Sequence, residues 1–272
     1  MYRKLVFSLL LSVTVFALHE DFEFAPRIIH GQPIREEFIP TSLAVMGFEE
    51  NLVKSYCGGT LIAEDVVLTA AHCVEKELDF LISTQSNLLP LQIQPDKSRL
   101  ATHVAIPKNY NKPSKNDHDI ALIFLETPFW HIKPAKLINP KAASMLQDGL
   151  PVHIVGWGLE EPNLSSMVQH NWQRRKVYAK SFIDEISQYK MRVGRSVFDP
   201  RQCSGDSGSA TYLENSVSKE LFVIGVVSHG YTWDGPCMTG SYNMRVDAYV
   251  PWIQETMQNA CDKGWRNHRF CP

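Results

Sequence analysis

The chain has 272 residues, of which 44% are hydrophobic, and its formal net charge at pH 7 is -2. This length and hydrophobic content allow a sizeable core, in one domain or in two fused halves. A net charge near zero gives no sign of a nucleic-acid or other acidic partner. The 16 prolines and 15 glycines are spread along the chain, which favours many short strands and turns over a helical bundle.

Residues 1–17 have the pattern of a secretory signal peptide. Arg3 and Lys4 give a charged start, residues 5–16 form an apolar or small-residue run, and the run ends in a small-residue cleavage pattern at Ala17. A membrane anchor is the alternative interpretation, but the run is shorter than the roughly 20 residues that a span needs. We therefore expect secretion (extracellular, periplasmic or into a storage granule) and no membrane contact after signal removal.

An activation segment is predicted at 18–27. It is acidic and aromatic and ends in Arg27, directly before Ile28-Ile29-His30-Gly31. The simplest interpretation of the two isoleucines is the start of a strand. Cleavage after Arg27 would instead create an α-amino group on Ile28, with a pKa of about 8, and an acid further along the chain could pair with it.

Two cysteines bracket the strands that are expected next. Residues 41–46 are predicted to form a strand, and short β-rich runs follow between Cys57 and Cys73. They predict a hairpin that holds His72 on a tight Ala-Ala-His-Cys corner. A lone histidine in an apolar stretch is usually packed or solvated, so His72 alone predicts no activity.

Asp119 stands directly before an apolar run, 120–125, which is typical of a buried strand. A carboxylate in such a place is costly to bury unless it is hydrogen-bonded. Asp119 therefore calls for a hydrogen-bonding partner from elsewhere in the chain.

The strongest signal is the Cys-Ser-Gly-Asp-Ser-Gly-Ser stretch at 203–209. A serine is no nucleophile at neutral pH unless a base takes its proton and donors stabilise the oxyanion. Ser207 lies on a glycine turn, where backbone N–H groups can converge and a substrate can approach. Asp206 beside it calls for a cation, which the Ile28 ammonium would supply. Breaking a buried pair of this kind costs about 3–5 kcal/mol, enough to control a neighbouring loop and thus to switch on a zymogen.

Three motifs together identify a family. Thr-Ala-Ala-His-Cys at 69–73, Asp-His-Asp-Ile-Ala-Leu-Ile at 117–123 and Gly-Asp-Ser-Gly at 205–208 follow one another in that order. With the Ile28 start, they resemble the chymotrypsin/trypsin family of serine endopeptidases, peptidase S1. The resemblance extends to about Asn259.

The resemblance implies an all-β fold of two antiparallel six-stranded Greek-key β-barrels with a C-terminal helix. The protease domain would cover 28–260, and a tail at 261–272 would be closed by a disulfide. Export permits disulfides, and the chain has six cysteines. Family precedent pairs Cys57 with Cys73 and Cys203 with Cys237, which leaves Cys261 for Cys271. Relatives often have a further disulfide in the region of 181–200, so we expect this loop to be looser here, or held by packing alone.

The resemblance also implies catalytic roles, which are carried over from the family's triad mechanism. Ser207 would attack the peptide carbonyl, His72 would take and return the proton, and Asp119 would orient His72. The N–H groups of Gly205 and Ser207 would bind the oxyanion. The reaction would pass through an acyl-enzyme, which water would hydrolyse. Asp117 is a nearby competitor, but only Asp119 directly precedes Ile-Ala-Leu.

A substrate pocket follows from the same resemblance. Most relatives have tryptophan in place of His229 and glycine in place of Ser209. The added side chain of Ser209, just behind Ser207, could slow catalysis without abolishing it. The expected substrate-binding residues are Arg201, Gln202, Ser228, His229, Gly230 and Gly240.

Arg201 occupies the pocket base, where trypsin-like members have aspartate. If it points into the pocket, an acidic residue before the scissile bond is favoured, because like charge disfavours lysine and arginine. If it turns aside, for example towards Asp199, the pocket could accept apolar or aromatic residues. A blocked pocket is the third alternative.

The remaining expectations concern partners. We expect protein or peptide substrates, an activating protease that cuts after Arg27, protein inhibitors, a monomer, and no cofactor or metal. Glu75, Glu77 and Asp79 are too loosely arranged to predict a calcium site. Asn163 begins a glycosylation sequon.

Two rival functions stay open. Arg201, His229 and Ser209 keep open a catalytically silent relative that acts as a binding protein. An esterase or lipase of another fold is poorly supported, because the Gly-x-Ser-x-Gly elbow is absent and the motif order is wrong for it.

Overall fold

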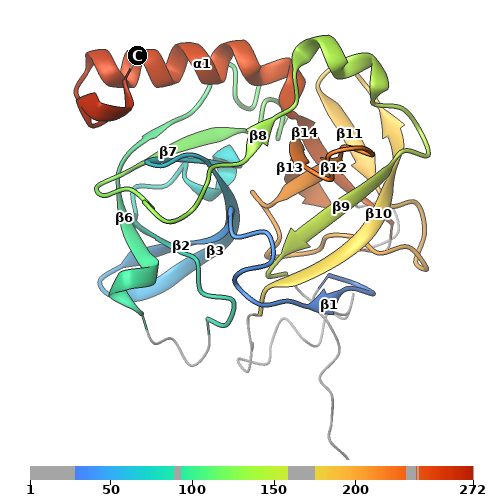
Figure 1. Cartoon of the computed structure of the whole chain (residues 1–272), viewed down its shortest axis with the longest axis horizontal. Helices are drawn as coiled ribbons and strands as arrows, with labels where there is room; N and C mark the ends of the chain where they lie inside the picture. Colours follow the sequence, from blue (N-terminus) through green and yellow to red (C-terminus); the bar gives the residue numbers. More distant parts are fainter. Residues whose placement is uncertain (1–27, 89–92, 159–174, 231–236, 238, 272) are drawn as a thin grey trace, which may run out of the picture.

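The computed structural model describes residues 28–88, 93–158, 175–230, 237 and 239–271 (Figure 1). The predicted signal peptide, the activation segment and Asn163 lie outside the described residues. Within them, no helix combines the length and the apolar character that crossing a membrane requires.

Six antiparallel strands of the N-terminal half close into a barrel in the order β2-β3-β4-β7-β6-β5. Strands β4 and β7 are buried at every residue, which confirms the buried strand predicted after Asp119. The strands are β2 (Ser42–Glu49), β3 (Leu52–Ala63), β4 (Val66–Thr69), β5 (Asp79–Ser83), β6 (Ser98–Ala105) and β7 (Ala121–Leu125).

A second antiparallel barrel follows in the C-terminal half, closed because β9 pairs with both β10 and β12. Its order is β9-β10-β11-β14-β13-β12. The strands are β9 (Pro151–Gly156), β10 (Val177–Ile186), β11 (Lys190–Val193), β12 (Ala210–Glu214), β13 (Leu221–Gly230) and β14 (Ser241–Arg245). Two short strands join it at its margins, β1 (Gln32–Pro33) on β10 and β8 (Lys136–Leu137) on β13.

Helical structure is confined to short segments and one long helix among the described residues. The long helix, α1 (Val246–Asp262), continues from β14 and extends across the end of the first barrel (Figure 1). The 3₁₀ helices are η1 (Ala71–Cys73), η2 (Pro95–Lys97), η3 (Pro140–Met145) and η5 (His268–Phe270). The fold is therefore the predicted one, two six-stranded barrels with a C-terminal helix.

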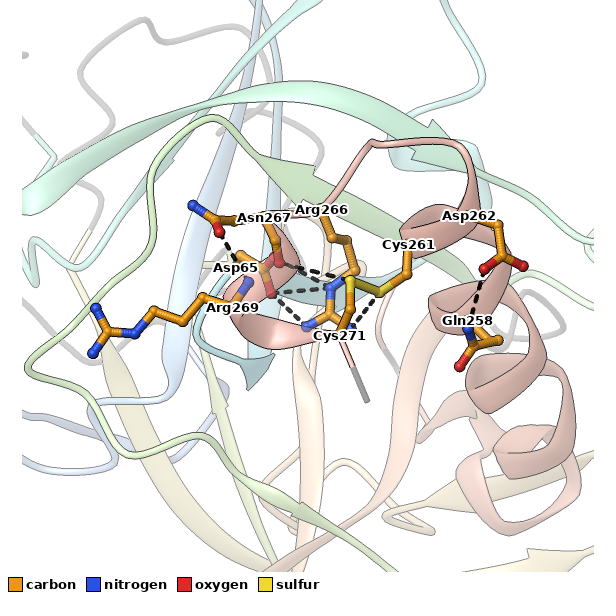
Figure 2. Close-up of a disulfide and its surroundings, with 8 residues drawn as sticks. All are labelled: Asp65, Gln258, Cys261, Asp262, Arg266, Asn267, Arg269 and Cys271. Atoms are coloured by element: carbon orange, nitrogen blue, oxygen red, sulfur yellow. Dashed lines mark hydrogen bonds and ion pairs between the residues drawn. A yellow bond between two sulfur atoms is a disulfide. The ribbon is translucent and has the colours of Figure 1, made fainter.

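The three expected disulfides are present, Cys57–Cys73, Cys203–Cys237 and Cys261–Cys271. The last closes a hairpin, residues 261–271, that folds back from α1 onto the first barrel. There the ring of Trp265 stacks on His103 with 4.5 Å between centroids. Figure 2 shows Arg266 of this hairpin directed at Asp65.

The segment 181–200 is held by ion pairs as well as packing. The carboxylate of Asp184, on β10, bridges Arg192 of β11 and Arg195 of the following loop. The side chain of Asp184 is only 4% exposed. We expected either a looser loop or one held by packing alone, and the second alternative is wrong, because a buried carboxylate needs compensating donors and the two arginines supply them.

Candidate active site

His72 is held at the junction of β4 and η1. Its flanking residues Ala71 and Cys73 are buried, and Cys73 is bonded to Cys57 of β3. The ring Nδ1–H donates to Asp119 Oδ2 at 2.7 Å, and the backbone N–H of His72 donates to Oδ1 at 2.9 Å. The two oxygens of one carboxylate thus fix both the backbone and the ring of His72.

Asp119 is fully buried in the loop before β7, from which Ile120 separates it. A further donor comes from the second barrel, because the Ser228 hydroxyl lies 2.5 Å from Oδ2. Burial alone would raise the pKa of Asp119, but the hydrogen bonds and charge of His72, together with the Ser228 hydroxyl, outweigh it and hold the pKa below its ordinary value. Asp117 instead forms an ion pair with Lys190, at 2.6 Å, so the structure brings Asp119 and not Asp117 to His72.

Ser207 lies on a turn that depends on its glycines. Gly205 has φ +95° and Gly208 has φ +78°, a region that favours glycine. A Cβ on Gly208 would overlap the carbonyl oxygen of Gly58. The Ser207 carbonyl accepts from the Gly58 N–H at 2.6 Å, which fastens the turn to β3 of the first barrel.

In the described part of the chain, the N–H groups of Gly205 and Ser207 donate to no other group. The side chains of Ser207 and His72 are not joined in the same way as those of His72 and Asp119. Among the described residues, no hydrogen bond joins Ser207 Oγ to His72, whose Nε2 lies 3.8 Å from Cys73 Sγ. Catalytic hydrogen bonds are often formed only with substrate bound.

Asp206 and Ile28 are both fully buried. The Asp206 carboxylate accepts from the N–H groups of Gly158, at 2.6 Å, and Cys203, at 2.8 Å. Ile29 exchanges two backbone hydrogen bonds with Arg201, at 3.2 and 3.3 Å. Residues 28–29 therefore lie against the segment that carries Arg201 and Asp206.

Arg201 is buried, with 1% of its surface exposed. Its Nη1 donates to the carbonyl oxygens of Val197 and Asp199, at 2.9 and 3.0 Å, and its Nε donates to that of Cys237. Burial lowers the pKa of Arg201, opposed by the charge of Asp199. The Arg201 side chain thus turns aside towards Asp199, which was one of the three alternatives. It binds the backbone carbonyl of Asp199 and not the carboxylate.

The other predicted pocket residues gather near this base. Ser228, His229 and Gly230 end β13, and Gly240 directly precedes β14. Gln202 is fully buried and accepts from the Ser241 hydroxyl at 3.1 Å. Its Nε2 has no partner among the described residues.

The side chain of Ser209, two residues after Ser207, occupies space that is free because Gly58 has no side chain. A Cβ on Gly58 would overlap Ser209 Oγ. The backbone of Ser209 is bonded on both sides, its N–H to Asp206 and its carbonyl to Val227, each at 2.9 Å. Glycine at position 58 thus compensates for serine at position 209.

The contact of Ser228 with Asp119 was missed by sequence reasoning, which placed Ser228 only in the substrate pocket. The signal available was its place at the end of the buried run Val226–Val227, where a polar side chain needs a partner. For a metal, the described residues offer one cluster of possible ligands, Cys57, His72 and Cys73. Both of these cysteines are in a disulfide, so neither supplies a thiolate.

A buried aspartate bonded to a histidine, a serine on a glycine turn and a frame of two barrels together have the arrangement of the chymotrypsin-like class of serine proteases. The family model "Trypsin" matches residues 28–253, and the chain belongs to this family.

Two curated relatives illustrate the similarity. The chain is 26% identical over 242 residues to "Chymotrypsin-like elastase family member 1" of Canis lupus familiaris, covering 85% of this chain and 92% of the relative. It is 27% identical over 259 residues to "Cathepsin G" of Mus musculus, covering 92% of each chain.

Proposed function

We propose that the protein is a secreted serine endopeptidase, made as a zymogen and activated by cleavage after Arg27. The observation that carries this proposal is the buried pairing of Asp119 with His72. Because the carboxylate can only accept, the hydrogen of a neutral His72 lies on Nδ1 and leaves Nε2 as the base. The three disulfides are consistent with an oxidising, extracytoplasmic environment.

In the proposed reaction, Ser207 Oγ attacks a peptide carbonyl and its proton passes to His72 Nε2. Asp119 stabilises the imidazolium that forms. The N–H groups of Gly205 and Ser207 stabilise the oxyanion, with a contribution of roughly 3–4 kcal/mol for one donor. His72 then protonates the leaving amine, and water hydrolyses the acyl-enzyme on Ser207.

Activation would depend on the buried carboxylate of Asp206. Two backbone N–H groups donate to this carboxylate, and a new ammonium group on Ile28 would form an ion pair with it. We propose that this pair orders the turn that carries Ser207, because breaking a buried pair costs about 3–5 kcal/mol.

The primary specificity is proposed to differ from that of trypsin. A guanidinium at the pocket base repels lysine and arginine side chains. Because the Nε and Nη1 groups of Arg201 are bound to backbone carbonyls, we favour apolar or aromatic residues before the scissile bond. A preference for acidic residues is the alternative, and the experiment must distinguish it from the apolar or aromatic preference.

The test uses protein cleaved after Arg27, with Ser207→Ala as control, on peptides varied at the residue before the scissile bond. Cleavage after Phe, Leu or Tyr is expected. Cleavage after Glu or Asp, abolished in Arg201→Ala, would assign the acidic specificity instead. Cleavage after Lys or Arg would refute both.

A second candidate function is that of a silent homologue that binds proteins without cleaving them. The observation that favours it is that the described residues include no hydrogen bond between Ser207 and His72. A serine-reactive phosphonate decides between the two. Labelling of Ser207 in the cleaved protein supports the protease, and failure to label supports the binding protein.

A further inference from the structure

We propose that His229 is a positioning residue, which acts on the catalytic base through Ser228 and Asp119, and that protonation of His229 suppresses the triad in mild acid. This inference rests on the proposed protease function.

A continuous chain of hydrogen bonds joins the two histidines. His229 Nδ1 lies 2.9 Å from Ser228 Oγ, Ser228 Oγ lies 2.5 Å from Asp119 Oδ2, and Oδ2 lies 2.7 Å from His72 Nδ1. Two hydrogen bonds thus separate the His229 ring from the carboxylate that orients the base.

The direction of each hydrogen bond in this chain follows from the number of protons available. An ionised carboxylate only accepts, so the single proton of the Ser228 hydroxyl points at Asp119. The lone pair left on Ser228 Oγ must then accept a hydrogen bond from the Nδ1–H of His229. His229 and His72 therefore both carry hydrogen on Nδ1, and both act on the same oxygen, Asp119 Oδ2.

The surroundings keep the His229 ring in place and neutral near pH 7. On β14, the ring of Tyr242 packs against it with 5.2 Å between centroids. Burial and then the charge of Lys190 lower the pKa of His229, and His72 adds to this effect, whereas Asp119 and Asp117 oppose it. These groups come from β11, from η1 and from the loop before β7.

Protonation of His229 would change what Asp119 can do for His72. In both its forms, His229 carries hydrogen on Nδ1 and holds the Ser228 hydroxyl on Asp119, so the forms differ only in charge. In its charged form, it places a second cation close to an imidazole that must itself become cationic when Ser207 attacks. Like charges oppose that step, so activity falls with the protonation of either histidine.

The test compares two substitutions in the cleaved protein. His229→Asn keeps an N–H donor near the place of Nδ1 but cannot titrate, and His229→Leu removes both properties. The matched control is His131→Asn, at an exposed histidine. The measurement is the pH dependence of kcat and KM for one peptide substrate, together with the unfolding temperature of each variant.

The acid limb of log kcat/KM is expected to approach a slope of two for the wild type and the His131 control. The slope should fall to one for both His229 variants. At mildly alkaline pH, His229→Leu should lose about tenfold in kcat, the value of one hydrogen bond, and His229→Asn should lose less. A loss confined to KM, with equal acid limbs in all variants, would overturn the proposal and leave His229 as a wall of the substrate cleft.

A measurement without turnover separates this proposal from the proposed protease function. In Ser207→Ala protein, NMR titration of His72 should shift between His229 and His229→Asn, whether or not the wild type cleaves peptides. An identical His72 titration in the two proteins would refute the coupling. A shifted titration, together with failure of Ser207 to label with phosphonate in the Arg27-cleaved wild type, would refute the protease function and leave the coupling intact.

Discussion

Arg266 of the C-terminal hairpin forms a buried ion pair with Asp65, at the turn between β3 and β4. Arg266 Nη2 lies 2.7 Å from Asp65 Oδ1, and each side chain is 4% exposed (Figure 2). The pair fastens the end of the chain to the first barrel, across 201 residues of sequence.

Removing one partner should therefore destabilise the whole protein. We expect Arg266→Met to lower the free energy of unfolding by about 3–5 kcal/mol, because it leaves the Asp65 carboxylate buried and unpaired. Urea denaturation measures the change. Arg269→Met is the control, since Arg269 lies exposed over the ring of Trp130. Recovery of part of the loss in Asp65→Asn/Arg266→Met is expected, and equal losses in the single and double variants would contradict the pairing.

Lys176 gives the stability of the protein a predicted pH dependence. It is fully buried, and its Nζ donates to the carbonyl oxygen of Ile39 at 2.7 Å. Burial lowers the pKa of Lys176 to about 7, although Glu36 and Glu37 oppose the shift. In the unfolded chain a lysine titrates near pH ~10.4. Between these values the unfolded state binds more protons, so stability rises with pH.

The matching experiment compares Lys176→Met with the wild type and with Lys180→Met, an exposed control. The cost of the buried charge is fully present below the folded-state pKa. Lys176→Met should therefore be more stable than the wild type in mild acid, and its advantage should shrink as the pH rises towards ~10. Thermal unfolding across this range provides the measurement, and an advantage independent of pH would rule out the titration of Lys176.

The hydroxyl of Ser209 is predicted to be destabilising. It is fully buried, and its Oγ has no partner among the described residues. Ser209→Ala should therefore raise the free energy of unfolding by about 1 kcal/mol, since an unsatisfied buried hydroxyl is removed. Ser181→Ala is the control of opposite sign, because the Ser181 hydroxyl donates to the Pro200 carbonyl at 2.7 Å. Destabilisation by both substitutions would show that Ser209 Oγ has a partner.

Asp206→Asn tests the proposed activation. An amide cannot neutralise an ammonium group, so cleavage after Arg27 should no longer raise activity, and kcat/KM should fall by at least about a hundredfold. In the wild type, activity should be lost at alkaline pH as the Ile28 amine loses its proton. The pairing would raise the pKa of this amine above about 8. Full activation of the Asp206→Asn variant would exclude the pair.

The sequence predicted what is local or shared by a family, and missed contacts that form only when separate parts of the chain fold together. The barrels and the Asp119–His72 pair were predicted because each motif is a short run of residues. The bond from Ser228 to Asp119 joins residues 109 positions apart and has no local signature. The orientation of Arg201 was left open because its partners are carbonyl oxygens, which every residue has. The bridge made by Asp184 could not be read from spacing either, because a bulge in β10 at that point sets its direction.

The bond between Ser228 and Asp119 also has a consequence for folding. His72 and Asp119 belong to the first half of the chain, whereas Ser207 and Ser228 belong to the second, so neither half contains the whole of the proposed site. Such long-range contacts form late, after the local pairing of neighbouring strands. On refolding, strand content should return before activity. The rate at which activity returns would then report the rate at which one half docks against the other.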